Sequence, residues 1–346
     1  MNTSSYSLKQ IIDPHEWQTF LLKQEYMLMT QSWNYFNFYK LMDEEAWIFG
    51  VYSGDTLVGG AFVTTVHAKR GNFLYIPYGP IAEDNHKVHV LSLLTQQLKK
   101  IGKEHNYVCI RISPFWDNNT DNKKLFEELH FQNAPMHTLA ETTWILGLSD
   151  DSETLLKNME KNHRNLIKRC EKEGVTIQVS DDIGELQTFQ KLHDETAKRH
   201  NFVRFPNEYI EKEFSSFNPN HEVLVLSAYL PDGRLDSSAV VYFYGTMAAY
   251  RHGASLMQDK RLPTSYALQW CAINEAKKRG LKYYNFWGIA PQGAPKNHPF
   301  TGITHFKKGF GGFEKDLLPC QDLGLSWKYY PMQLLEKFRK LKRGFS

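Results

Sequence analysis

The sequence predicts a mixed α/β fold in which one structural unit occurs twice. The chain has 346 residues, more than one average hydrophobic core accommodates, so two domains are expected. Segments 47–66 and 223–244 both alternate apolar and polar residues around a Gly-Asp or Asp-Gly turn, which is the pattern of a β-hairpin. Leu57 of the first segment aligns with Leu235 of the second. The repeated hairpin therefore indicates an internal duplication.

A long amphipathic helix and a further strand follow each hairpin. The stretch HVLSLLTQQLKKIGKEHNYVCIRISP closes at Pro114, and YALQWCAINEAKKRGLKYYNFWGIAP closes at Pro291. Both have the apolar period of a helix, then a short turn, then a run typical of a buried strand. The shift that aligns the hairpins aligns these stretches to within one residue. We predict α/β (α+β) tandem domains in the order of the GNAT acyltransferase fold; the alternative is the general likeness of all α+β domains.

A polar linker separates the two predicted domains. GLSDDSETLLKNM, which begins at Gly147, offers Ser and Asp side chains that can cap the next helix. We place domain 1 at residues 1–150 and domain 2 at residues 151–324. Residues 325–346 are predicted to form a basic amphipathic helix that completes domain 1.

This carboxyl-terminal helix has two chemically different sides. Four apolar residues share one face, namely Leu334, Phe338, Leu341 and Phe345, and five Lys or Arg residues lie between positions 337 and 343. Such a helix either rests on an anionic membrane surface or packs on a domain with its charges in water. Of the two, we favour packing on a domain.

Composition excludes several classes of protein. With 42% hydrophobic and 23% charged residues, the chain is expected to be globular, and no apolar run approaches the roughly 20 residues of a membrane span. The start, MNTSSYSLKQIIDPHEW, lacks the pattern of a secretion signal. Four separated cysteines and 14 histidines without ligand spacing predict reduced thiols, a cytoplasmic location and no metal site. A net charge of +3 does not predict polyanion binding, which would need local basic clusters.

The loops that open the two long helices are not suited to coenzyme A. A GNAT domain holds the pyrophosphate of coenzyme A on the backbone of a Q/R-x-x-G-x-G/A loop. The second unit has RLPTSY there, with Thr264 and Tyr266 where glycines are needed, and the first unit has DNHKVHVL at 84–91. We therefore expect no bound cofactor, and an acyl group delivered by another carrier.

Five motifs in order then resemble the FemABX family of aminoacyl-tRNA-dependent peptidoglycan aminoacyltransferases. They are TQSWNYFNFYK (30–40), KNHRNLIKRCEKEGV (161–175), YRHGAS (250–255), YNFWGIAP (284–291) and HPFTGITHFKKGFGG (298–312). The resemblance covers nearly the whole chain. The chain has no long charged heptad insertion. It is therefore similar to the compact members of the family, which lack the coiled-coil arm.

This resemblance implies the reaction and the partners. A stem-peptide amine of a peptidoglycan precursor, UDP-linked or lipid-linked, attacks the aminoacyl ester at the 3′ end of a tRNA. The attack creates an oxyanion beside phosphate-bearing substrates, so the site needs fixed positive charge. Contact with the membrane through the carboxyl-terminal helix would suit a lipid-linked precursor.

The same resemblance assigns the reacting end of the tRNA to HPFTGITHFKKGFGGF. Phe306 and Lys307 match the family's Phe-Lys pair, in which the lysine would stabilise the oxyanion or the terminal phosphate. Aromatic rings here could stack on the terminal adenine. Lys308 is a second tRNA candidate, although neighbouring residues of an extended segment face opposite sides, which would turn it to water. Gly309, Gly311 and Gly312 are expected to let the backbone turn tightly.

The resemblance also implies residues that bind the precursor. Lys40 matches the lysine that holds the precursor diphosphate, and Trp33 belongs to the same motif. The second phosphate-binding residue is Arg204 or Arg199, because one sequence does not fix the register. Tyr266 corresponds to a tyrosine that lines the precursor channel, or it only packs at the start of a helix. Arg251 either points into that same channel or points elsewhere.

Other polar residues have weaker assignments. Four basic residues lie along one stripe of a helix, as phosphate contacts or as a solvated face: Lys161, Arg164, Lys168 and Arg169. His298 could move protons or only order a loop. Ser113 and Asn285 stand where relatives have Asp, so Ser113 is not the base, and proton removal falls to water or to the substrate.

Two other functions remain open from the sequence. The chain could be a GNAT-type N-acyltransferase that uses an acyl-CoA or another thioester. It could also bind precursor or tRNA without catalysing transfer, although Lys40 and the Phe306-Lys307 pair favour an enzyme.

Overall fold

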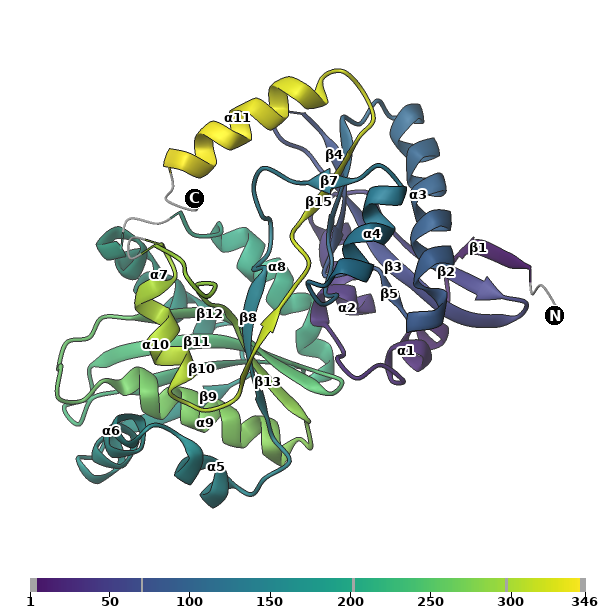
Figure 1. Ribbon diagram of the computed structural model, residues 1–346. Coiled ribbons are helices and arrows are strands. Elements are labelled where there is room, and N and C mark those ends of the chain that lie inside the picture. The colour runs from purple at the N-terminus through teal and green to yellow at the C-terminus, as the bar shows by residue number, and fades with distance from the viewer. Residues whose placement is uncertain (1–4, 70, 201–202, 296–297, 343–346) are drawn as a thin grey trace.

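The computed structural model describes residues 5–69, 71–200, 203–295 and 298–342, and Figure 1 shows that they form two sheets with helices packed around each. The first sheet has the order β1-β2-β3-β4-β6-β15-β7, with β5 on β3, and the second has the order β14-β8-β13-β12-β11-β10-β9. No helix in the described ranges is long and apolar enough to span a bilayer.

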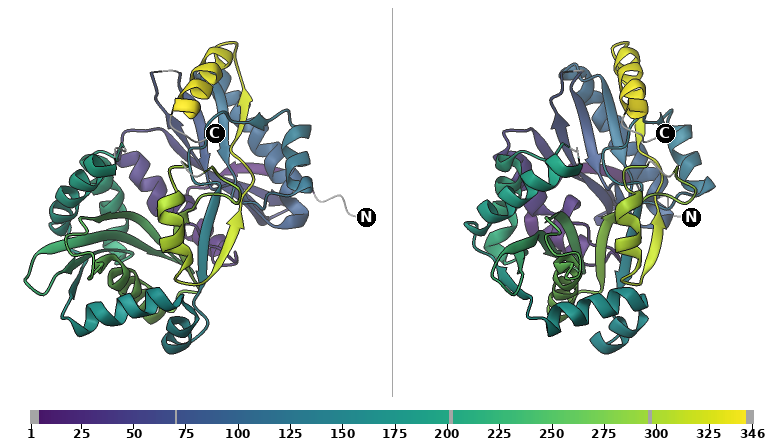
Figure 2. Two further views of the ribbon diagram at one scale, coloured as in Figure 1. Left: turned by 60° about the vertical axis from the view of Figure 1, so that its left-hand side comes forward. Right: turned by 90° about the vertical axis from the view of Figure 1, so that its left-hand side faces the viewer.

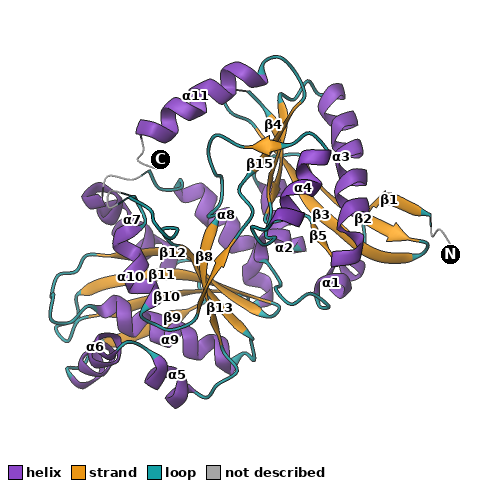
Figure 3. Ribbon diagram, in the orientation of Figure 1, coloured by secondary structure: helices purple, strands orange, loops and turns teal. Residues whose placement is uncertain are grey.

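The strands of the first sheet are β1 (Tyr6–Gln10), β2 (Ala46–Ser53), β3 (Thr56–Val66), β4 (Phe73–Pro77), β5 (Ile81–Ala82), β6 (Cys109–Ser113), β7 (Gln132–Asn133) and β15 (Gln321–Gly324). Those of the second are β8 (Thr142–Gly147), β9 (Thr176–Ser180), β10 (Val223–Tyr229), β11 (Leu235–Tyr244), β12 (Met247–Ser255), β13 (Tyr283–Gly288) and β14 (Phe313–Asp316). The helices, which Figure 3 distinguishes from the strands, are α1 (Pro14–Leu21), α2 (Trp33–Leu41), α3 (Lys87–Glu104), α4 (Thr120–Glu128), α5 (Ser152–Asn158), α6 (Lys161–Lys172), α7 (Glu185–His200), α8 (Asn207–Phe217), α9 (Thr264–Lys278), α10 (Thr301–Lys308) and α11 (Tyr329–Lys342).

The predicted duplication is present. Hairpin β2–β3 in the first sheet corresponds to hairpin β10–β11 in the second, and both are antiparallel. Each half then has one parallel pair whose strands are joined through its long helix: β4 with β6 through α3, and β12 with β13 through α9. A parallel pair needs such a crossover, because a tight turn cannot join parallel strands.

The two halves exchange strands across the boundary expected at residue 150. Strand β8 precedes that boundary but pairs with β13 and β14 in the second sheet. Strand β15, which lies inside the predicted domain 2, pairs with β6 and β7 in the first sheet. The chain thus crosses between the sheets twice, and a single cut at residue 150 does not separate them. The linker pattern marked a turn correctly but could not show which sheet each neighbouring strand joins.

Alternation along β11 explains how the second sheet is covered. Ala239, Val241 and Phe243 pack with Leu268 of α9 in one core cluster. The intervening residues Val240, Tyr242 and Tyr244 pack with residues of α7 and α8 and with residues of the first half in another cluster. Successive strand residues face opposite sides, so one strand contributes to two cores.

This second cluster joins the two halves. Phe38 of α2 contacts Tyr209 of α8 with ring centroids 4.8 Å apart, and the Asn34 amide donates to Glu222 at 2.5 Å. The views of Figure 2 show α1 and α2 (purple) against the second half. Helix α2, which carries most of the motif TQSWNYFNFYK, is therefore held at the junction of the halves.

Helix α11 packs on the first sheet through an unexpected face. Tyr329, Met332 and Glu336 are buried, whereas Leu334 and Phe338 are 56% and 63% exposed. The helix does pack on a domain, as favoured, but the predicted apolar face is not the side that makes this contact among its described residues; Arg343 and Phe345 lie outside them. The cause is an ion pair: Glu336 meets the buried Arg111 of β6 at 2.7 Å and turns the apolar face outward.

Candidate active site

The stretch that carries Lys307 forms a helix, not an extended segment. Helix α10 ends at Lys308, so the two lysines lie about 100° apart around a helix axis. Lys307 is 6% exposed, and its Nζ donates to the carbonyl of Gly288 at 2.6 Å. Lys308 instead pairs with Glu314 at 2.8 Å and lies over the ring of Trp144. The expectation that Lys308 simply faces water was wrong, because it assumed a strand.

Lys307 has no carboxylate to compensate it within the part of the chain that the structure describes, since its single hydrogen bond goes to a backbone carbonyl. Burial lowers the pKa of its ammonium group from 10.5 to about 7. A cation in this state gains free energy when an anion arrives, because the anion supplies the missing countercharge. Perturbed groups of this kind are typical of functional sites.

Phe306, the neighbour of Lys307 in the Phe-Lys pair, faces away from the Lys307 side chain and packs toward α6 and α9. The Phe306 ring meets the ring of Tyr266 at 5.0 Å, and the Phe306 carbonyl is 3.0 Å from Nε2 of the buried His163. Helix α10 therefore packs on α6 and α9 through Phe306. Tyr266 therefore contacts the Phe-Lys pair. Packing, which was one of its two predicted roles, is in part the role that it has.

The glycines that follow Lys308 are required for different structural reasons. A Cβ on Gly309 would lie 1.9 Å from the His163 ring, so Gly309 is required by the close packing of α10 on α6 and not by a turn. Gly311 and Gly312 have φ of 84° and 105° and do form the predicted turn, which leads into β14.

The end of β13 positions the carbonyl that holds Lys307. The Asn285 Oδ1 accepts from the backbone N–H of Trp287 at 2.8 Å and from the Thr143 hydroxyl at 2.6 Å. Trp287 has φ of 68°, a conformation that costs a bulky residue free energy and is often kept at functional sites. Asn285 thus supports a local kink just before Gly288, a role that an Asp could also fill.

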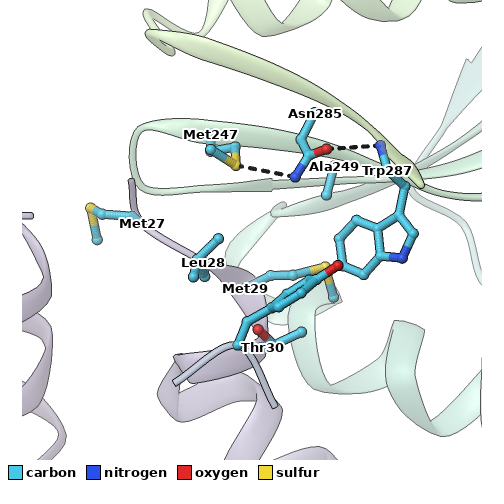
Figure 4. Close-up of a pocket in the computed structure, with 9 residues that line it drawn as sticks. Met27, Leu28, Met29, Thr30, Met247, Ala249, Asn285 and Trp287 are labelled. Carbon is cyan, nitrogen blue, oxygen red and sulfur yellow. Dashed lines mark hydrogen bonds between the residues drawn. The ribbon is translucent and has the colours of Figure 1, made fainter. Parts of the chain in front are cut away.

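A cavity of about 10 Å³ lies beside this kink, and Figure 4 shows Trp287 and Asn285 on one side of it and Met29 and Thr30 on the other. The strand pairing of β12 with β13 stops at Ala249, next to the cavity. Beyond that point the two strands diverge, and Arg251 of β12 lies over the Trp287 ring at 5.1 Å.

Arg251 is neutralised and does not offer a free charge to a cleft. Its Nε donates to Glu213 at 3.1 Å, its side chain is 4% exposed, and Glu213 also pairs with His252 at 2.8 Å. Burial alone would lower the pKa of Arg251, but Glu213 raises it above its usual value. The guanidinium also donates to the Tyr209 hydroxyl at 3.2 Å, which links β12 to α8 and, through Phe38, to α2.

A larger pocket, about 450 Å³, opens between the halves at the amino end of α2. It is lined by Pro14, His15, Gln18, Trp33, Asn34, Asn220, Glu222 and Tyr244. Burial raises the pKa of Glu222 to about 7, so this carboxyl group titrates near neutral pH. The sequence indicated Trp33 but not Glu222, since nothing in its local pattern shows that it meets α2.

Comparison with known proteins decides the family. The FemAB family matches residues 12–236 and 232–318. The chain belongs to the FemAB family. A similar curated protein is the Lipid II:glycine glycyltransferase of Staphylococcus aureus (strain USA300), 21% identical over 339 residues that cover 77% of this chain and 79% of the relative.

Solved structures agree on the fold. The crystal structure of FemX has a TM-score of 0.81 at 18% identity and covers 95% of this chain and 100% of its own. A tandem GNAT protein from the clavulanic acid biosynthesis pathway has a TM-score of 0.58 at 8% identity and covers 93% of this chain and 99% of its own. The predictions of a FemABX-type chain, of duplicated GNAT-like domains and of an enzyme of the aminoacyltransferase class are confirmed.

Within this FemAB fold, the residues predicted to hold precursor phosphates lie on α2, on α7 and just before α8. Lys40 is exposed at the carboxyl end of α2. Arg204, just before α8, pairs with Asp194, and its Nη1 donates to the Phe205 carbonyl at 2.8 Å. Arg199 donates to the carbonyls of Ser255 and Leu256. Lys40 and Arg199 are exposed and Arg204 is half-buried, and both arginines already donate to protein acceptors.

The basic stripe of α6 is divided between two roles. Arg164 donates to the carbonyls of Lys157 and Met159 and so terminates α5, and Arg169 reaches the Arg261 carbonyl at 3.4 Å. Lys161 and Lys168 are exposed. His163 of the same helix contacts α10, so the exposed lysines lie on a helix that directly supports the Phe-Lys pair.

Two remaining polar candidates have structural partners. Ser113 is 5% exposed and bonds the Tyr75 hydroxyl at 3.1 Å and the Cys320 sulfur at 3.4 Å. The His298 ring accepts from the Phe300 N–H at 3.1 Å, which orders the loop before α10, and burial lowers the pKa of His298.

Sequence reasoning missed the buried carboxylates Glu213, Asp322 and Glu336, which are all 0% exposed. One signal was available: Arg111 stands in the apolar strand CIRIS, where a lone charge must have a buried partner.

Proposed function

We propose that this protein transfers an amino acid from aminoacyl-tRNA to the stem-peptide amine of a peptidoglycan precursor. The observation that carries the proposal is Lys307 at the Phe-Lys pair of a FemAB chain, a buried cation that has no carboxylate partner among the residues that the structure describes. Its relatives named Lipid II:glycine glycyltransferase support both the reaction class and the precursor.

Lys307 can act on the charge that the reaction creates. The amine nitrogen attacks the ester carbonyl carbon, a C–N bond forms, and the carbonyl oxygen becomes an oxyanion. When the oxyanion collapses, the ester C–O bond breaks, the ribose oxygen leaves, and the proton of the amine passes through water or substrate groups to that oxygen. A lysine in a dry site stabilises the oxyanion or the nearby terminal phosphate much more than it would in water.

The remaining substrate contacts follow from exposure and position. Lys40 and Arg204 flank the packed pair α2–α8 and would hold the precursor diphosphate. The exposed Lys161 and Lys168 of α6 would contact the tRNA backbone. Added salt should weaken these contacts, because phosphate contacts gain free energy from the release of counterions. Phe306 fixes α10 on α6 and α9, so its main role here is to position Lys307.

The proposal includes no bound cofactor. At the start of α9, where a GNAT domain would hold coenzyme A, Thr264 is 0% exposed and donates to Asp236 at 2.6 Å. A side chain locked in this way occupies the place where a glycine would let a pyrophosphate approach. This arrangement favours tRNA over a thioester as the acyl donor, in a reaction on the cytoplasmic side where charged tRNA is made.

The test is transfer from a charged tRNA in vitro. The purified chain is incubated with tRNAs bearing different labelled amino acids and with UDP-linked or lipid-linked precursor, and the stem peptide is analysed by mass spectrometry. We expect an extended stem peptide, about 100-fold or more less of it with Lys307→Met, and unchanged transfer with Lys100→Met, an exposed lysine on α3. Transfer from acyl-CoA but from none of the charged tRNAs would refute the proposal.

A further inference from the structure

Helix α11 is built the opposite way round from an ordinary surface helix. A surface helix usually turns its apolar stripe to the core and its charges to water. Here the one acidic residue, Glu336, is 0% exposed, whereas Leu334, Phe338 and Leu341 are 56%, 63% and 65% exposed. Glu336 is buried because its carboxylate pairs with Arg111 inside the first half.

The exposed apolar residues form one continuous stripe. Tyr330, Leu334, Phe338 and Leu341 follow each other at intervals of three or four residues, which places them on a single side of the helix. Trp327, just before the helix, is 73% exposed, and Leu335 beside the stripe is 53% exposed. An apolar patch of this extent on a protein surface marks a contact with another body. We call these six residues the outward face of α11.

Basic residues border the outward face. Lys337, Arg339 and Lys342 are exposed, and Lys340 is half-buried. Because the only acid of the helix is buried and paired, the exterior of α11 carries positive charge alone. Trp and Tyr near the start of the helix, followed by Leu and Phe and flanked by Lys and Arg, are the composition of helices that lie in a membrane interface.

The anchor keeps this face turned outward. Arg111 bonds Asp322 through two contacts of 2.7 Å and Glu336 through contacts of 3.2 and 2.7 Å, and the Tyr329 hydroxyl donates to Asp322 at 3.1 Å. Rotating α11 to bury Phe338 would break these bonds and leave charges buried without partners. Figure 1 shows α11 (yellow) at the rim of the first half, extending toward the second.

We propose that the outward face of α11 binds the surface of a bilayer that contains anionic phospholipid. The inference deepens the proposed function and rests on it in one respect, namely that the acceptor is lipid-linked and lies in that bilayer. Contact of two copies through this face fits less well, because a symmetric contact would bring the basic borders of both helices together. Membrane docking would hold the active site beside its acceptor instead of requiring each encounter to begin in solution.

The test is co-sedimentation of the full chain with vesicles of phosphatidylcholine, with and without phosphatidylglycerol. We expect binding to the anionic vesicles and at least about tenfold weaker binding for Leu334→Ser/Phe338→Ser, because each side chain contributes apolar burial. Val88→Ser, which removes a similarly exposed apolar side chain from α3, should bind like the wild type. Replacing Lys337 and Lys342 by Gln should weaken binding to anionic vesicles about fivefold per charge and leave binding to neutral vesicles unchanged.

Two results would overturn the inference. One is equal vesicle binding by wild type and by Leu334→Ser/Phe338→Ser. The other is a wild-type dimer in light scattering that this variant converts to a monomer, with no vesicle binding by either, since a second copy would then cover the face.

Transfer assays separate this inference from the proposed function. With a UDP-linked acceptor in solution, the Leu334→Ser/Phe338→Ser variant should match the wild type; with a lipid-linked acceptor in anionic vesicles, it should fall about tenfold. Absence of transfer by the wild type to either acceptor would refute the proposed function and leave the vesicle-binding result standing.

Discussion

Each half of the molecule has a buried cation at the equivalent strand of the repeat, but the two cations differ in their ion-pair partners. Arg111 lies on β6 and pairs with Asp322 and Glu336, both fully buried. Lys307 lies against the end of β13, the equivalent of β6, and bonds only a carbonyl within the described chain. Burial lowers the pKa of Lys307 to about 7, whereas Arg111 keeps its charge because its two carboxylates outweigh burial and raise its pKa.

The difference distinguishes a cation that holds structure from one that serves a reaction. A buried charge with partners is costly to disturb, because removing it leaves the partners uncompensated. A buried charge without partners destabilises the fold and is kept where a ligand or an intermediate will supply the countercharge. The predictions below test this distinction, from the largest expected effect to the smallest.

Arg111→Met should be the most damaging substitution of the set. It leaves Asp322 and Glu336 buried without their cation, and the expected loss in the free energy of unfolding is about 3–5 kcal/mol. Denaturant unfolding measures it. A loss below 1 kcal/mol would mean that Arg111 does not hold the two carboxylates in solution.

Lys307→Met should have the opposite profile. Transfer activity is expected to fall about 10²–10³-fold, because a positioned charge at the oxyanion is lost. The free energy of unfolding should stay the same or rise, because an uncompensated buried cation is replaced by an apolar side chain. Thermal unfolding and transfer assays on the same preparation check both; a variant that is less stable and still active would reverse the comparison.

The pKa of Lys307 also predicts a pH dependence. Between pH 7 and 10.5 the unfolded chain holds a proton on this lysine that the folded chain lacks, so stability due to Lys307 rises with pH across that window. The gain is at most about 1.4 kcal/mol per pH unit. The difference in unfolding free energy between wild type and Lys307→Met should therefore change steadily from pH 7 to 10; a constant difference would contradict the shift. In kcat/KM, loss of the ammonium charge should appear as a falling limb near pH 7 that Lys307→Met lacks.

Glu336→Gln should have the smallest effect. Arg111 keeps its two-contact pairing with Asp322, and the cluster goes from two carboxylates per cation to one. We expect a change of about 1 kcal/mol or less in the free energy of unfolding. A loss as large as that of Arg111→Met would show that the bond to α11, and not the pairing with Asp322, stabilises this half.

The sequence predicted the parts of the fold that depend on local pattern. Hairpins, long helices and closing strands were found in both halves because alternation and 3.6-residue periods are local properties. The exchange of β8 and β15 was not predicted, since a strand's pattern shows that it is buried but not which sheet buries it. The helix of Lys307 was not predicted, because the expectation for this stretch was an extended segment followed by a glycine turn, although Gly309 ends α10 and is required by the close approach of His163.

For the candidate site, the resemblance located Lys307 and Trp33, but sequence could not show how charges are paired. The sequence left open whether Arg251 points into the cleft, and in the structure it is bound to Glu213, which lies 38 positions earlier in the chain. The apolar stripe of α11 was identified correctly, yet its direction depended on a single carboxylate, Glu336, and on a partner 225 positions away. Such pairings come from the tertiary fold and leave no periodic trace.

The crossing of β15 into the first sheet affects how the chain is made. Asp322 and Glu336, the partners of Arg111, emerge from the ribosome only after the entire second half has been synthesised. Until then the first sheet lacks its closing strand and carries an unpaired arginine, so it cannot reach its final state as an independent unit. The amino-terminal half can therefore complete its fold only after the carboxyl-terminal segment has been translated. A chain released early would lack both the ion pairs of Arg111 and helix α11, which depends on them.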